Sequence, residues 1–178
     1  PSKSRGLGDV YKRQLKRDME VALCQNTAKN AGNATTARQT RSFEAWITTN
    51  KSRGTGGADG SASAAATDAA TGNRRALTEA LLKGVLQSMF TNGAEPKMAI
   101  AGPVNKGVIS GFTGRANTRQ NVSADTVSAS ISVYASDFGE LQIVPSNRSR
   151  DRSLLLVDPE YAKVCLLYTS DAADERQS

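Results

Sequence analysis

Residues Arg74–Phe90 read RRALTEALLKGVLQSMF and give the clearest helical pattern in the chain. Apolar side chains recur at 3.6-residue spacing and form one broad stripe, which consists of Leu77, Leu81, Leu82, Val85, Leu86, Met89 and Phe90. Asn73 is the predicted N-cap, and Asn92-Gly93 predicts the end of the helix. Gly84 inside the helix costs about 1 kcal/mol relative to Ala, so we expect it to pack closely against a neighbouring element.

Strand patterns follow this helix. Lys97–Ala101 reads as a buried strand, and Gly102-Pro103 opens a short second helix that runs through Phe112, with Pro in the first turn.

Two later segments also predict strands. Ser130–Tyr134 alternates apolar and polar residues, and Leu141–Val144 follows after a turn at residues 136–139. Together they predict a β-hairpin with a loop of roughly four or five residues. Leu154–Val157 is a fully apolar strand that ends at Asp158-Pro159. Helices and strands in one domain, with one large loop excursion, indicate an α+β fold class.

The residues before Arg74 are mostly polar. Leu15–Gln25 predicts a helix whose apolar residues share one face, and Asn26–Thr40 predicts a loop. Phe43–Thr49 carries the only Trp and predicts a small buried anchor. Lys51–Asn73 is rich in Gly, Ala and Ser, whose side chains bury little area. We therefore expect a flexible surface loop there, more mobile than its flanks.

The two ends of the chain have an unusual origin in this interpretation. Ser4–Gln14 (SRGLGDVYKRQ) and Cys165–Glu175 (CLLYTSDAADE) can be back-translated so that ATGTGTATAAGAGACA in the first is the reverse complement of TGTCTCTTATACACAT in the second. Such inverted copies resemble the transposon-type adapters used for sequencing libraries. We expect residues 1–14 and 165–178 to be translated adapter without structure, and Leu15–Val164 to be an internal fragment of a longer gene. Ordinary disordered tails are the alternative.

The composition is basic with or without the two ends of the chain. The whole chain has 23 Lys/Arg, 17 Asp/Glu and a net charge of +6 at pH 7, and without the two ends 18 and 13 remain. This balance favours contact with phosphate or acidic partners but does not establish it. No apolar run approaches the roughly 20 residues that a membrane helix needs, so no membrane partner is predicted. Without Cys165, Cys24 cannot form an internal disulfide bond. This fits a reducing compartment or a fold that needs no disulfide.

Several kinds of reactive site are excluded by residue type or spacing. The sequence has no His, which removes Ser-His-Asp, Cys-His and HExxH chemistry. Ser110 lies in GVISG, which lacks the spacing of a nucleophile elbow. The Gly-rich SRGTGGADG at 52–60 lacks GK[ST], so a plain loop is favoured over a phosphate loop. Asp137 and Glu140 bracket a turn, where bonding to the backbone is the favoured role. We therefore predict no enzyme, no catalytic residue, no metal ligand and no cofactor.

Arg148, Arg150 and Arg152 form the densest positive cluster. In an extended segment they would point to one side and could bind phosphate or an acidic neighbour. A solvated loop with local ion pairing is the favoured interpretation, because no aromatic residue that could stack on bases lies beside the cluster.

Eight short motifs in order resemble a family of known proteins. They are LKRDME (15–20), FEAWITTN (43–50), SRGTGG (52–57), LTEALLK (77–83), GPVNK (102–106), VISGFTG (108–114), VYASDFG (133–139) and LVDPEY (156–161). Their order resembles the major capsid proteins of tailed bacteriophages, of the Hong Kong ninety-seven fold type. The resemblance covers essentially all of Leu15–Val164.

The resemblance implies a division of the chain into parts of that fold. Residues 15–72 would hold the end of a long spine helix and a peripheral-domain segment. Residues 73–153 would form an axial-type domain, and residues 154–164 would return as a strand to the peripheral domain. The N-terminal arm, the extended loop and the closing peripheral strands are missing from this pattern. We therefore expect Leu15–Val164 alone not to form shells, which electron microscopy can test.

The implied function is a structural subunit that assembles with copies of itself, as hexamers and pentamers, into the head shell. Scaffold or decoration proteins and non-specific contact with packaged DNA are implied partners, and the virion, assembled in the host bacterial cytoplasm, is the implied location. The arginine cluster would then form salt bridges between subunits or face the DNA. Two alternatives remain: a small basic nucleic-acid-binding module, and an enzyme domain whose histidines lie outside this segment.

Overall fold

Helix α3 spans Glu79–Thr91 in the computed structural model, which describes residues 7–112 and 133–163. It begins later than the sequence predicted. Thr78 is extended and its side chain accepts a hydrogen bond from the Leu81 amide, 3.3 Å away, so Thr78 and not Asn73 is the N-cap. A hydroxyl at this position satisfies an amide that has no partner within the helix, and Glu79 in the first turn favours the positive end of the helix dipole. Asn73 instead ends a short 3₁₀ turn, Thr71–Asn73.

The predicted end of α3 is confirmed. Asn92 is the C-cap and Gly93 has φ of +78°. The Ala94 amide donates to the Met89 carbonyl at 2.9 Å, which closes the last turn. The prediction for Gly84 was wrong: Gly84 is exposed, and a Cβ placed on it would meet nothing within 4 Å.

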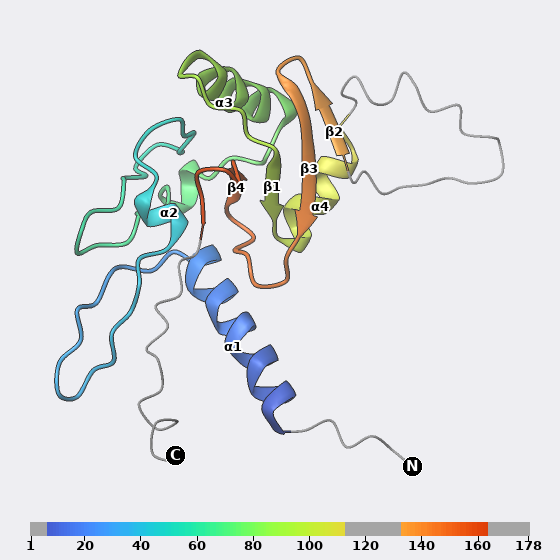
Figure 1. Ribbon diagram of the computed structural model, residues 1–178. Coiled ribbons are helices and arrows are strands. Elements are labelled where there is room, and N and C mark those ends of the chain that lie inside the picture. Colours follow the sequence, from blue (N-terminus) through green and yellow to red (C-terminus); the bar gives the residue numbers. More distant parts are fainter. Residues whose placement is uncertain (1–6, 113–132, 164–178) are drawn as a thin grey trace, which may run out of the picture.

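Four strands form one mixed sheet in the order β2-β3-β1-β4 (Figure 1). They are β1 Met98–Ala101, β2 Val133–Ser136, β3 Gly139–Pro145 and β4 Leu154–Val157. β1 is parallel to β3 and antiparallel to β4, while β2 and β3 are antiparallel. The mixture of helices and strands agrees with the predicted α+β class.

The parallel pairing of β1 and β3 requires a crossover, and helix α4, Pro103–Ser110, lies within it. Pro103 stands at the start of this helix, as predicted, because its missing amide is not needed there. The helix ends before the predicted Phe112, since Gly111 caps it, and Phe112 is buried in the core instead.

The predicted hairpin is present as β2 and β3, with a shorter loop than expected. Ser136 pairs with Gly139, so only Asp137 and Phe138 form the turn. Gly139 has φ of +124°, a conformation that side chains rarely adopt and that permits the tight reversal. The Ser136 hydroxyl donates to the Gly139 carbonyl at 2.8 Å. The expected strand residues 130–132 lie outside the described residues.

β4 differs from its predicted place. The resemblance implied a strand that returns to a separate peripheral part, whereas Leu154–Val157 is the edge strand of the same sheet. Ala99 lies opposite Leu156 and Ala101 lies opposite Leu154, and both leucines pack against the core. Their apolar contact with β1 explains the position.

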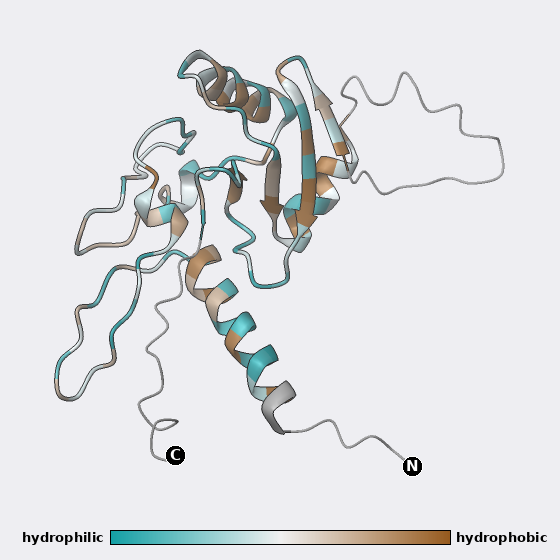
Figure 2. Cartoon of the chain, viewed as in Figure 1, coloured by the Kyte–Doolittle hydropathy of each residue, from teal (hydrophilic) through white to brown (hydrophobic). Residues whose placement is uncertain are grey.

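The core joins α3, α4 and the sheet into one cluster. Its buried members are Leu82, Leu86, Ala99, Ala101, Ile109, Phe112, Tyr134, Leu141 and Ile143. Figure 2 shows hydrophobic residues concentrated on the strands and on α3 and α4, while the loops beside α2 (Phe43–Trp46) are mostly hydrophilic. Tyr134 is fully buried and its hydroxyl donates to Glu79 at 2.9 Å. Burial and the neighbouring Glu79 carboxylate raise the Tyr134 pKa.

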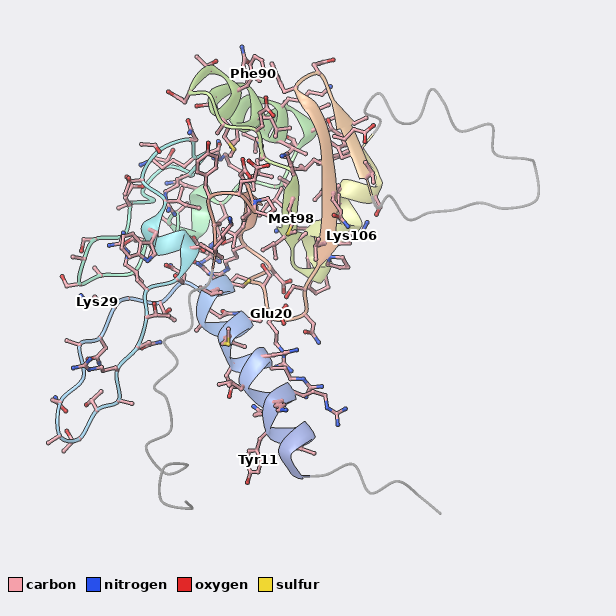
Figure 3. All side chains as sticks on the ribbon, in the orientation of Figure 1. Tyr11, Glu20, Lys29, Phe90, Met98 and Lys106 are labelled. Atoms are coloured by element: carbon pink, nitrogen blue, oxygen red, sulfur yellow. The ribbon has the colours of Figure 1, made fainter. Side chains whose placement is uncertain are left out.

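Helix α1, Leu7–Cys24, projects away from the sheet (Figure 1). It begins at Leu7 and not at the predicted Leu15, so residues 7–14 are helical where no structure was expected. Its C-terminal end contacts the loop between β3 and β4. The Ser146 hydroxyl donates to Glu20 at 2.5 Å, and Figure 3 shows Glu20 near that loop. Cys24 is buried, and burial followed by the charge of Glu20 raises the pKa of its thiol.

No helix in the described ranges is both long and apolar enough to cross a membrane.

Candidate functional site

Arg150 joins two segments that are far apart in sequence. One terminal nitrogen, Nη1, donates to Glu44 Oε2 at 2.7 Å, and the other, Nη2, donates to both oxygens of Asp68 at 2.7 and 2.6 Å. Only 15% of the Arg150 side chain is exposed. Local ion pairing is therefore confirmed for Arg150, but its surroundings are largely buried and not the solvated loop that the sequence favoured.

Glu44 receives three donors at the same place. Besides Arg150, the Ser153 hydroxyl donates at 2.6 Å and Arg53 approaches the carboxylate at 3.5 Å. Glu44 lies on the short helix α2 and is 8% exposed. A buried carboxylate is costly unless its oxygens are paired, and these donors supply the pairing.

The other two arginines of the predicted cluster behave differently. Arg152 reaches Asp68 at 3.2 Å, but 54% of its side chain is exposed. Arg148 takes part through its backbone: its amide donates to the Ser146 hydroxyl at 3.1 Å, and its carbonyl accepts from Gln25. The three side chains therefore do not act together on one side of an extended segment. We call Glu44, Asp68, Arg150 and Arg152 the arginine clasp.

The charged groups of the clasp shift one another's pKa values through their ion pairs. Burial alone would raise the pKa of Asp68, but hydrogen bonds and attraction from Arg150 and Arg152 outweigh it and hold that pKa below its ordinary value. Burial alone would lower the pKa of Arg150, and the two carboxylates outweigh it and raise that pKa. Both groups are therefore charged at neutral pH, and both terminal nitrogens of Arg150 already donate to carboxylates.

The clasp fastens a segment that we call the strap, residues 51–73. Within the strap, Lys51 and Arg53 pair with Asp59, and Ala58 forms an antiparallel bridge with Thr67. The Asn26 side chain bonds the Ala66 amide at 2.9 Å and its carbonyl at 2.5 Å. The strap lacks regular strands, as expected. It is nevertheless held by specific contacts, which the sequence did not predict.

One glycine explains how the strap approaches α2. A Cβ on Gly60 would lie 2.5 Å from the Ala45 carbonyl oxygen and 2.8 Å from its Cα. Only a residue without a side chain allows this approach, so the small residues of the strap serve close packing of backbone against backbone.

A cavity of about 630 Å³ lies between α3, β4 and the chain from Trp46 to Gly54. We call it the groove. Its apolar lining includes Leu77, Leu81, Val85 and Met89 from α3 and its approach, and Leu154–Leu156 from β4. The apolar stripe of α3 is thus shared: Leu82 and Leu86 enter the core, while Leu81, Val85 and Met89 line the groove. Phe90, at the end of the stripe, packs on Phe138 instead. No strand among the described residues pairs with the outer side of β4.

Polar contacts tie the walls of the groove together. Asn50, with φ of +48°, accepts hydrogen bonds from Ser88 at 2.9 Å and Asn92 at 2.8 Å, both on or next to α3. Arg75 donates to the Ser52 hydroxyl at 3.1 Å. These contacts position the first residues of the strap beside α3.

Trp46 is not the buried anchor that the sequence predicted. It is 61% exposed, and the Arg41 guanidinium lies 4.2 Å from its ring centroid. The buried residues of this segment are Glu44 and Ala45, because the ion pairs of Glu44 and the close contact with Gly60 hold that side of α2 inward. Trp46 instead forms part of the groove lining.

Nothing in this arrangement resembles a reaction centre. The sequence has no His, and in the part of the chain that the structure describes no group of three metal-ligating residues occurs. Ser110 donates to the Lys106 carbonyl at 3.0 Å within α4, and Asp137 and Glu140 lie at the hairpin turn as predicted. The site can therefore hold segments and surfaces together.

Sequence reasoning located Arg150 and Arg152 but missed Glu44, Asp68, Arg53 and Ser153. The one available signal was the presence of charged residues of both signs in an otherwise small-residue segment, at Lys51, Arg53, Asp59 and Asp68.

The chain is similar to a family of known proteins. A family model described as SU10 major capsid protein matches residues 12–177. No curated protein matches the chain.

Proposed function

The chain belongs to the SU10 major capsid protein family and is a structural subunit of a phage head, and on this premise we propose that it has the Hong Kong ninety-seven type of fold. The observation that carries the proposal is the family match, which spans residues 12–177. Members of such a family assemble into a shell, so the partners of this chain include copies of itself.

The arrangement of elements supports the proposed fold. We assign α1 to the end of the spine helix and residues up to 72 to a peripheral segment. The sheet with α3 and α4 corresponds to the axial-type part, which would point to the centre of a hexamer or pentamer. β4 belongs to the same sheet, so the return to the peripheral part is proposed to follow Val157.

The assembly mechanism that we propose is multivalent. Many weak contacts between identical subunits sum to a stable closed shell, so no single interface needs high affinity. Scaffold or decoration proteins, non-specific contact with packaged DNA and assembly in the host cytoplasm belong to this proposal. The origin of residues 1–14 and 165–178 in translated adapter is a separate proposal, and the family match overlaps both ranges.

Cryo-electron microscopy of particles encoded by this gene tests the fold and the shell together. We expect capsomers in which α1 lies along the shell and the β2-β3-β1-β4 sheet points to the capsomer centre. A reconstruction whose shell density fits another fold, with this chain elsewhere in the particle or absent, would overturn the proposal.

A further inference from the structure

We propose that the strap, residues 51–73, is a hinged cover of the groove that the arginine clasp holds closed. Opening the clasp releases the strap while the core of α3, α4 and the sheet stays folded. The inference rests on the proposed function for its purpose, because a subunit that occupies both hexamers and pentamers needs a segment that can change position. Its physical basis is independent of assembly.

The strap has little apolar burial to hold it. Gly60 and Ala66 are its only buried residues, and neither has a large side chain. Ordering the backbone costs about 1–2 kcal/mol per residue, which such burial cannot offset. The strap therefore depends on polar contacts to a much greater degree than the core elements do.

Ion pairs account for much of the contact between the strap and the rest of the molecule. Asp68 is held by Arg150 and Arg152, and Arg53 contacts the Glu44 carboxylate and donates to the Glu44 carbonyl at 3.2 Å. The links outside the ion pairs are the hydrogen bonds of Asn26 to Ala66 and of the Arg75 guanidinium to the Ser52 hydroxyl. Loss of the ion pairs would leave these hydrogen bonds, at opposite parts of the strap, and the close contact of Gly60 with Ala45.

Arg150 is the positioning residue of the clasp. Its guanidinium binds one carboxylate on α2 and one on the strap, so it is the cation that bridges the two acids. Without that cation, Glu44 and Asp68 would be like charges close to one another, and both would lose a charge-assisted hydrogen bond. Removal of Arg150 therefore weakens the ionic link between α2 and the strap, which then rests on the contact of Arg53 with Glu44.

The same movement would change the groove. Residues at both ends of the strap, Lys51–Gly54 and Thr67–Ala69, line the groove opposite Leu81, Val85 and Met89 of α3. Release of the strap removes that wall and exposes the apolar face of α3. The clasp thus determines whether this face is covered by the chain itself.

Hydrogen exchange of the full chain at neutral pH, measured by mass spectrometry, tests the proposal. Arg150→Met keeps an unbranched apolar stem and removes the guanidinium charge. Arg148→Met is the matched control, because the Arg148 side chain belongs to none of the clasp's ion pairs. We expect Arg150→Met to speed exchange in strap peptides by on the order of tenfold, with Ala58 and Thr67 as reporters. Exchange in α3, β1 and β3 should stay at the wild-type rate, and the control should change nothing.

Asp68→Asn is the second variant. It weakens the strap side of the clasp and leaves the pair of Arg150 with Glu44, so the same selective increase is expected. Unchanged strap exchange in both variants, an equal increase in Arg148→Met, or global unfolding of both variants would overturn the proposal. The readout uses the isolated chain, so a failure to form shells would count against the proposed function and not against the strap.

Discussion

At the scale of single residues, Arg150 illustrates which information a sequence carries. Three arginines at alternate positions predicted a site of ionic contact, and that prediction is confirmed for Arg150 and Arg152. Their partners could not be predicted, because Glu44 lies 106 residues and Asp68 lies 82 residues from Arg150. Only the folded backbone brings them together. The exposure of Trp46 was missed for the same reason, since a short apolar run does not reveal which side of it is covered.

The lowered pKa of Asp68 predicts how the clasp responds to acid. A depressed carboxyl pKa contributes stability that is fully present above the unfolded value, about 3.9, and is lost as pH falls through the folded value. We expect the fluorescence of Trp46, the single Trp, to stay constant from pH 7 to 5 and to change below about pH 4. Asp68→Asn should remove this acid transition. Persistence of the same transition in that variant would show that another group causes it.

Tyr134 gives a second residue-level prediction. Tyr134→Phe removes the hydrogen bond from the buried hydroxyl to Glu79, which retains Lys83 as a partner at 3.0 Å. We expect the free energy of unfolding in urea to fall by about 1 kcal/mol. Tyr161→Phe is the control, because Tyr161 is 84% exposed and should leave stability unchanged. Equal effects of the two substitutions would contradict a stabilising role for this bond.

At the scale of elements, the spacing of apolar residues predicted the features that depend on neighbouring residues in the sequence. Helix α3, its end at Asn92-Gly93, the β2–β3 hairpin and the apolar strands were all predictable from the spacing of residues. The start of α3 was not, because Asn73 and Thr78 are both good caps and only the tertiary path selects Thr78. The parallel pairing of β1 with β3 could not be predicted either, because no local sequence pattern specifies which strands pair.

Two glycines of α3 and its cap should respond in opposite directions to the same substitution. Gly84→Ala should raise the free energy of unfolding by about 1 kcal/mol, because the site is exposed and open and Ala is the better helix former. Gly93→Ala should lower it by about 1 kcal/mol, because φ of +78° strains a residue with a Cβ. Urea denaturation of both variants measures the difference. A destabilising Gly84→Ala would mean that this face of α3 is packed after all.

At the scale of the whole molecule, the family match gives the function that the geometry alone could not. The core, the arginine clasp and the groove are compatible with a structural role. The described residues contain no group of three metal-ligating side chains and no arrangement that resembles a reaction centre. The motif order along the chain predicted a phage capsid subunit, and the family match confirms that prediction. Interfaces between subunits do not follow from one copy of the chain.

The proposed adapter origin of the C-terminal residues is testable at this scale. Trypsin cuts after Arg152, Lys163 and Arg176, so it yields SLLLVDPEYAK (153–163) and VCLLYTSDAADER (164–176). We expect the first peptide and not the second in particles assembled from the native gene. Detection of both peptides in equal amounts would show that the C-terminal residues are encoded in place.

The most direct test of the central claim is quantitative peptide mass spectrometry of purified phage heads that carry this gene. The peptides ALTEALLK (76–83) and SLLLVDPEYAK (153–163) report on α3 and β4. If the chain is the major capsid subunit, both peptides will occur in equal molar amounts and at least as abundantly as the peptides of any other head protein. Their absence from the heads, or an abundance typical of a minor component, would contradict the account.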